Sequence, residues 1–304
     1  MTSFWCEHQI NLSETEWLAC QAAHEHRVLR WIEPHLNRSS RNERHPVYDF
    51  LFEYYSLRPG QLLRWHPGIG IALQGTRAFD RLGWSAYTET PEGVASNAHA
   101  WKPDRRPFVK WLLNLLQATT GRPGHFGCFG LHEWAMVYRT PQVRHGKWPL
   151  RFSQAEIARI VDAQPVRCTH YDAFRFFTAE ARPLNRWQLA RETTSEFEQP
   201  GCLHANMDLY KWAYKLTPFA PSELVADAFE LAMEIREADM RASPYDLRAL
   251  GFAPIAIETP EGRAEYERLQ RCFSERAAPV RFRLISVCKR LLQTWEQRNP
   301  LSPG

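Results

Sequence analysis

The chain has 304 residues, a formal net charge of +4 and a hydrophobic fraction of 44%. This length allows one large domain or two ordinary ones, with a core that needs neither disulfides nor metal to stabilise it. The first residues lack a signal peptide's basic flank and apolar run, and no stretch approaches the roughly 18 apolar residues of a membrane span. The seven cysteines show no secreted disulfide pattern. We therefore expect a cytoplasmic protein with reduced thiols and no membrane partner.

The N-terminal part predicts a helix followed by a basic loop. Residues 13–36 place apolar side chains at uneven helical spacing, and Ser13 and Glu16 have the spacing of a capping box. The polar residues 37–45 predict a loop. We accordingly expect three parts: an N-terminal helix and loop at 1–44, a main helical domain at 45–295, and a disordered tail at 296–304.

The remaining pattern is mainly helical. Helices are predicted at 46–57, 106–120, 222–243 and 260–295. Ser222 is the expected cap of the third of these, and Pro279 the expected break in the last. Short strands are predicted in the Gly-rich and Pro-rich segment near 65–76 and at 255–257. The predicted fold class is mainly α: a single globular domain of packed helices with a minor strand or irregular component.

Residues 121–216 hold the most distinctive pattern of the chain. Three cysteines each precede a histidine, and each pair is followed by an acid. The three groups are Cys128, His132 and Glu133; Cys168, His170 and Asp172; and Cys202, His204 and Asp208. Aromatic residues surround all three groups. Titratable side chains packed among apolar rings have shifted pKa values, because burial disfavours the charged form. The stretch therefore predicts a functional site.

Carboxylates beside aromatic rings are typical of enzymes that excise a nucleobase. The flipped base is held between rings, and cleavage of the glycosidic bond develops oxocarbenium character that a nearby anion stabilises. We interpret the stretch as the site of a DNA base-excision glycosylase acting on alkylated or otherwise modified bases, with no cofactor. The predicted catalytic residues are Asp172, Asp208, Glu133, His170 and His204. Local ion pairs, Asp172 with Arg175 and Asp208 with Lys211, are the alternative explanation of two of these acids.

The same interpretation assigns a base pocket and a DNA-binding surface. The predicted base-binding rings are Phe129, Trp134, Tyr138, Tyr171, Phe174 and Phe176. The predicted phosphate contacts are Arg139, Arg144, Lys147 and Arg151, which form the densest basic group in the chain.

Two other functions remain open. The first is a metal-dependent oxygenase or hydrolase acting on a small molecule, with zinc or non-haem iron as the cofactor. Its candidate ligands are His132, Cys168, His170, Cys202 and His204. The Cys-x-His spacing is shorter than that of structural zinc sites, and Met136 stands where an HExxH motif needs its second histidine. The second is a non-catalytic nucleic-acid-binding protein, which fits the mild basicity.

Four runs of sequence resemble a known family. They are HFGCFGLHEWAMVYR, RCTHYDAFRFF, EQPGCLHANMDLYKWAYKL and DMRASPYDL. They are similar to bacterial proteins commonly labelled 3-methyladenine DNA glycosylase, and the resemblance covers about residues 45–285. It implies a hydrolase of N-glycosyl bonds that binds DNA and acts in repair. The chain has no helix-hairpin-helix segment of the LPGVG type, so the resemblance assigns no catalytic residue.

Overall fold

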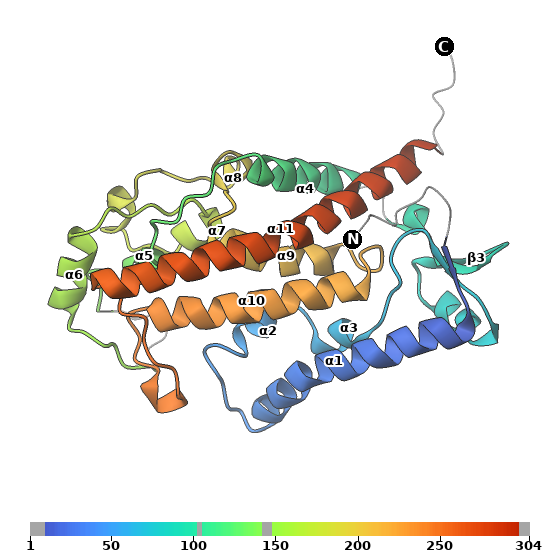
Figure 1. Cartoon of the computed structure of the whole chain (residues 1–304), viewed down its shortest axis with the longest axis horizontal. Helices are drawn as coiled ribbons and strands as arrows, with labels where there is room; N and C mark the ends of the chain where they lie inside the picture. The colour runs from blue at the N-terminus through green and yellow to red at the C-terminus, as the bar shows by residue number, and fades with distance from the viewer. Residues whose placement is uncertain (1–9, 102–104, 142–147, 298–304) are drawn as a thin grey trace, which may run out of the picture.

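Helix α10 (Ser222–Ala242) forms the centre of the structure, a computed structural model that describes residues 10–101, 105–141 and 148–297. It is buried on most of its circumference, because small residues such as Ala228 and Ala232 let its neighbours approach closely. Helices α9 (Leu203–Lys215) and α11 (Pro260–Gln297) pack against it, and α4 (Arg105–Thr120) packs along α11. Figure 1 shows α10 and α11 running side by side with α4 on the far side of α11.

One long helix and several short ones surround this centre. α1 (Glu14–Ser40) packs against α10 and α3 (Pro59–Leu63), and it places Val28 and Ile32 in the main core. The other α-helices are α2 (Phe50–Tyr54), α5 (Leu131–Ala135), α6 (Gln154–Asp162), α7 (Tyr171–Phe174) and α8 (Thr194–Phe197). The predicted mainly α class with a minor strand component is confirmed.

A four-stranded sheet lies at one end of the molecule (Figure 1). Its strands are β1 (Ile10–Leu12), β2 (Ile71–Leu73), β3 (Tyr87–Thr90) and β4 (Gly93–Ser96), in the order β1-β2-β4-β3. The β1–β2 pair is parallel and the other two pairs are antiparallel. With α1 and the 3₁₀ helix η1 (Thr76–Gly83), the sheet encloses a second, smaller core of Trp17, Trp65, Leu73, Ala78, Tyr87 and Val94.

Several predicted boundaries differ from the structure. The capping box of Ser13 and Glu16 is present, but α1 continues through the expected loop as far as Ser40. Ser222 is not the cap of α10, because its hydroxyl bonds the backbone at Arg64 and His66 instead. The expected break at Pro279 does not occur, since α11 continues through this residue.

Other expectations differ in length or fall partly outside the described residues. The helix predicted at 46–57 is reduced to α2, and no strand forms at 255–257. The expected tail at 296–304 lies outside the described residues except for its first two, which belong to α11. Within the described ranges, no helix combines the length and the apolar character needed to cross a membrane. The six described cysteines are free.

Shortening a single side chain on the buried face of α11 is expected to destabilise the protein. Leu284 is fully buried, whereas Phe282, two residues earlier, is 69% exposed. We expect Leu284→Ala to lower the free energy of unfolding by about 2–5 kcal/mol, through lost apolar burial and the cavity left behind. The control Phe282→Ala is expected to change it by less than about 0.5 kcal/mol. Urea denaturation followed by circular dichroism measures both, and equal effects would contradict this packing of α11.

Candidate functional site

The site is assembled from five segments of the helical core. α5 carries His132 and Glu133. The residue that precedes this helix is Gly130, whose φ of +69° is a left-handed conformation that suits glycine. His170 directly precedes α7, and Glu198 directly follows α8. α9 carries His204 and Asp208, and α10 carries Arg236 and Asp239. On each of these two helices the spacing of four or three residues points both side chains to one face.

The three histidines of the sequence pattern converge. The ring centroids of His132 and His204 lie 4.5 Å apart with the rings nearly perpendicular, and those of His170 and His204 lie 5.4 Å apart. His204 therefore stands between the other two histidines. This convergence joins residues that are up to 72 positions apart in the sequence.

The first group, which we call the α5–α10 cluster, consists of His132, Glu133, His204 and Asp239. One donor atom from each residue lies within 4.8 Å of the others. His132 Nε2 and Asp239 Oδ1 form a buried ion pair at 3.0 Å, and neither atom has another hydrogen-bond partner among the described residues. A histidine nitrogen and a carboxylate oxygen at this separation, beside a second histidine, have the spacing of two ligands of one metal ion.

Arg236 holds the two acids of the α5–α10 cluster in place. Its Nη1 donates to Glu133 Oε1 and to Asp239 Oδ2, both at 3.1 Å. The guanidinium also lies 3.8 Å from the centroid of the Phe50 ring. Asp239 thus uses one oxygen for Arg236 and turns the other toward His132. Arg236 therefore orients the Asp239 carboxylate while leaving its Oδ1 without a bond to the guanidinium.

The second group, the α7–α9 cluster, consists of His170, Glu198 and Asp208. His170 Nε2 lies 3.5 Å from Glu198 Oε1 and 3.4 Å from Asp208 Oδ2. Asp208 is already well satisfied, because it accepts hydrogen bonds from Tyr55 Oη at 2.7 Å and Lys211 Nζ at 2.5 Å. Lys211 also pairs with Asp172 at 3.3 Å. This cluster therefore contains its own cation, and the expected Asp208–Lys211 ion pair is present.

Burial and neighbouring charges shift the pKa values of the histidines in opposite directions. Burial, with the nearby His132, lowers the pKa of His204 well below its ordinary value, so this imidazole is neutral. Burial also opposes the charged form of His132, but the Asp239 carboxylate outweighs it and raises the pKa of His132. Desolvation raises the pKa of Glu198 to about 7. His204 is thus available as a neutral nitrogen ligand, whereas His132 must first lose a proton that Asp239 stabilises.

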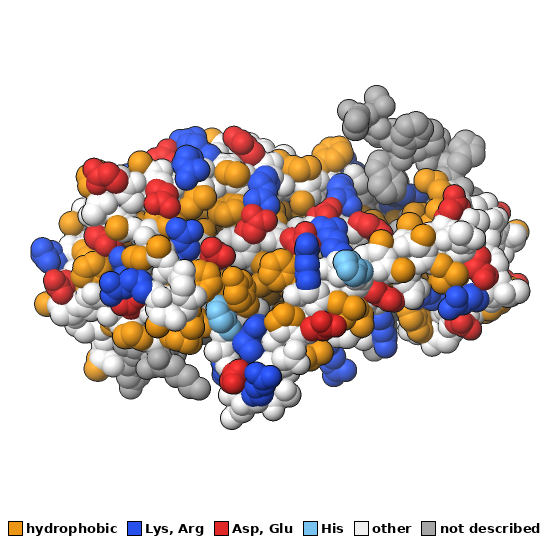
Figure 2. Space-filling model, turned by 60° about the horizontal axis from the view of Figure 1, so that its bottom comes forward, with side chains coloured by type: hydrophobic (Ala, Val, Ile, Leu, Met, Phe, Trp, Pro, Cys, Tyr) orange, Lys and Arg blue, Asp and Glu red, His pale blue; other side chains and the backbone are white. Residues whose placement is uncertain are grey.

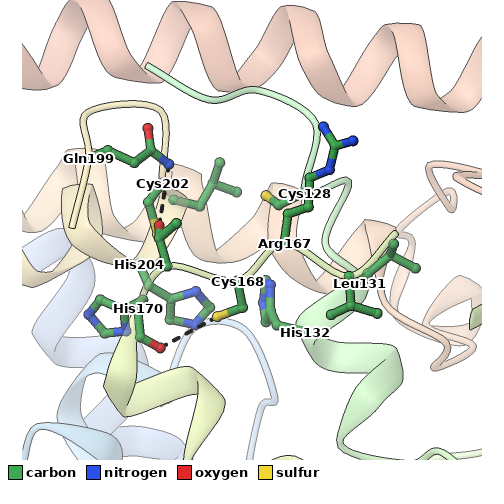
Figure 3. A pocket seen from close by; sticks show the side chains of 12 residues that line it. Cys128, Leu131, His132, Arg167, Cys168, His170, Gln199, Cys202 and His204 are labelled. Carbon is green, nitrogen blue, oxygen red and sulfur yellow. Dashed lines mark hydrogen bonds between the residues drawn. The ribbon is translucent and has the colours of Figure 1, made fainter. Parts of the chain in front are cut away.

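A small cavity adjoins the histidines (Figure 3). Its volume is about 10 Å³, close to the space that one water molecule needs. Its lining includes His132, His170 and His204 together with Cys128, Cys168 and Cys202. Burial raises the pKa of Cys168 to about 12 and keeps Cys202 protonated, so both are thiols rather than thiolates. Neither Cys168 nor Cys202, which were predicted ligands, belongs to a cluster with metal-ligand geometry in the described ranges.

The predicted base-binding rings lie around this site rather than in it, since none of the six lines the cavity. Trp134 is fully buried, and its Nε1 donates to the carbonyl of Ala242. Tyr138 donates to Asp162, and Phe174 packs against Phe177 in the core. The other three, Phe129, Tyr171 and Phe176, lie within or beside the same short segments and are less deeply buried.

The predicted phosphate contacts are partly engaged elsewhere. Arg144 and Lys147 fall outside the described residues. Arg139 pairs with Asp162, and Arg151 forms two 3.0 Å hydrogen bonds to Glu258 with only 8% of its side chain exposed. On the face shown in Figure 2, Lys and Arg side chains are interspersed with Asp and Glu.

Sequence reasoning missed three residues of the site. The sequence predicts Asp239 and Arg236 only as part of a long amphipathic helix, and it predicts no role for Glu198. The signal for the first two is a charged pair, three residues apart, on a helix whose same face is otherwise apolar. Glu198 carries no comparable signal, because its burial depends on contacts with distant segments.

Comparison of the chain with protein-family models, with curated proteins and with solved structures finds no match in any of the three. The resemblance to the family labelled 3-methyladenine DNA glycosylase therefore stays a prediction.

The buried ion pairs of Arg236 predict a large loss of stability on substitution. Its side chain is 1% exposed and faces two carboxylates. We expect Arg236→Met to lower the free energy of unfolding by about 3–5 kcal/mol, because it leaves uncompensated buried charge. Arg276 pairs with Glu234 at the surface, and the control Arg276→Met is expected to cost at most about 1 kcal/mol. Chemical denaturation measures both, and a stable Arg236→Met protein would argue against charged acids at this position.

Proposed function

We propose that the protein is a metal-dependent enzyme, a zinc or non-haem iron oxygenase or hydrolase acting on a small molecule. The observation that carries the proposal is the buried ion pair of His132 Nε2 and Asp239 Oδ1, which lie 3.0 Å apart beside His204 and have no other hydrogen-bond partner in the described ranges. Two histidines and one carboxylate are the ligand set of non-haem iron sites and also suit zinc. Glu133 supplies a fourth ligand atom, its carboxylate oxygen.

The charges of the α5–α10 cluster are compatible with a divalent ion. Its two carboxylates, of Glu133 and Asp239, face one cationic side chain, that of Arg236. With both histidines deprotonated this leaves a formal charge of −1, and a zinc or ferrous ion would compensate the buried carboxylates.

The chain's own residues have distinct parts in this proposal. His132, His204 and Asp239 bind the ion, and Arg236 fixes the orientation of Asp239. A bound metal supplies a Lewis acid that lowers the pKa of a coordinated water. The adjoining cavity has room for one water, and His170 on its wall, held between Glu198 and Asp208, is placed to accept or return a proton.

Base excision and non-catalytic nucleic-acid binding remain predictions. The metal-dependent function is placed ahead of both because the cavity beside the titratable residues has room for a water molecule and not for a nucleobase. The predicted base-binding rings also line no part of it.

Metal content is the first test of the proposal. Protein purified without chelators or an affinity tag is expected to contain about one equivalent of zinc or iron. His132→Gln and His204→Gln each remove a ligand and are expected to lower that content at least about tenfold. His125→Gln, which changes a histidine outside both clusters, is the matched control. Elemental analysis by mass spectrometry measures the metal content of the unchanged protein and of the three variants. Metal retained by both His132→Gln and His204→Gln would contradict the assignment.

The proton on His132 predicts a pH dependence of metal binding. The Asp239 carboxylate raises the pKa of this histidine, so lowering the pH protonates it and the proton competes with the metal. We expect apparent zinc affinity to fall about tenfold per pH unit below the pKa of His132 and to level off above it. Competition with a chromophoric chelator between about pH 5.5 and 8 measures this. An affinity independent of pH over that range would be inconsistent with a histidine ligand.

A further inference from the structure

A second hollow lies far from the histidine clusters in the fold, between α1, α3 and η1. Its volume is about 470 Å³, which is within the range of small-molecule sites. α1 contributes Trp17 and Gln21, η1 contributes Arg77 and Arg81, and Arg64 and Trp84 follow α3 and η1. None of the proposed metal ligands lines it.

Arg81 is the unusual residue of this hollow. It is 7% exposed, and its guanidinium lies between two indole rings, 4.3 Å from the centroid of Trp84 and 5.7 Å from that of Trp17. Its one side-chain hydrogen bond goes from Nη2 to Gln21 Oε1 at 2.6 Å. No carboxylate oxygen of the described residues lies within 4.0 Å of it. Buried charges in proteins are normally paired, and this guanidinium has only the more distant carboxylates of Glu25 and Asp80, with none in direct contact.

Two more guanidiniums border the same space. Arg64 lies 5.3 Å from the centroid of the Trp84 ring, and Arg77 lies on η1 one turn before Arg81. Neither forms an ion pair with a described residue. Two acids also line the hollow: Glu25, which accepts a hydrogen bond from Gln21 at 2.8 Å, and Asp80 on η1. The lining therefore keeps an excess of positive charge.

We propose that this hollow binds a small molecule through a phosphate group, with Arg81 as its buried anchor and Arg64 and Arg77 at its rim. Guanidinium groups match phosphate oxygens with paired N–H donors. The two indole rings hold the Arg81 guanidinium in a fixed plane and shield it from water, which strengthens its attraction for an anion. The proposal stands apart from the metal site and does not depend on it.

Isothermal titration calorimetry of the full-length protein tests this site. Inorganic phosphate and adenosine monophosphate are the two probes, titrated at constant ionic strength, and they separate free phosphate from a phosphate monoester. Saturable binding of either probe is expected, with affinity at least about tenfold weaker in Arg81→Gln. Arg186→Gln, which changes a guanidinium 5.1 Å from the Trp187 ring in another part of the molecule, is the matched control and should bind as the unchanged protein does.

Arg64→Gln serves as a second variant in case Arg81→Gln does not fold, because Arg64 is exposed. It is expected to weaken binding about threefold or more. Absence of saturable binding by both probes, or equal affinity in the folded variants and the unchanged protein, would overturn the proposal. A single-stranded oligonucleotide that binds in the place of both probes would also overturn it. The metal content of Arg81→Gln is measured as well. An unchanged content shows that a loss of phosphate binding does not come from damage to the metal site.

Discussion

Asp239 is the residue on which the site and the centre of the fold both depend. It is fully buried on α10, where a carboxylate has no water to solvate it. Oδ2 is satisfied by Arg236, and Arg236 in turn reaches Glu133 on α5, so the charge network fixes α5 against α10. Oδ1 faces His132 Nε2 at 3.0 Å and has no other hydrogen-bond partner in the part of the chain that the structure describes. The same charge network therefore fixes the helices and brings a histidine nitrogen and a carboxylate oxygen together inside the core.

Much of the helical architecture follows from the sequence, because helix periodicity and capping are local properties. The capping box at Ser13 and the long apolar pattern of 222–243 both predict helices that the structure contains. The predicted helix ends and breaks are wrong where contacts with distant residues determine the local structure. Ser222 has the side chain of a helix cap, but its hydroxyl instead accepts a hydrogen bond from the backbone N–H of His66 and donates one to the carbonyl of Arg64. Pro279 removes one backbone donor, yet α11 has packing partners along its length and continues.

The site was predictable in its histidines and not in its full set of acids. The repeated Cys-His pattern marks His132, His170 and His204, and the structure brings these three together. The cysteines of the same pattern are protonated thiols on the cavity wall, since burial raises their pKa values. Asp239 lies beyond residues 121–216, and Glu198 lies within them but outside the three Cys-His-acid groups. Only the packing of α8, α9 and α10 places them in the site.

The most direct test of a metal site between α5, α9 and α10 is anomalous diffraction from crystals of the protein purified without chelators. Data collected on both sides of the zinc and iron absorption edges locate an ion and identify its element. The account predicts one anomalous peak within about 2.0–2.2 Å of His132 Nε2 and of an Asp239 oxygen, with His204 as a further ligand. A map without such a peak, with a hydrogen bond joining His132 directly to Asp239, would contradict it.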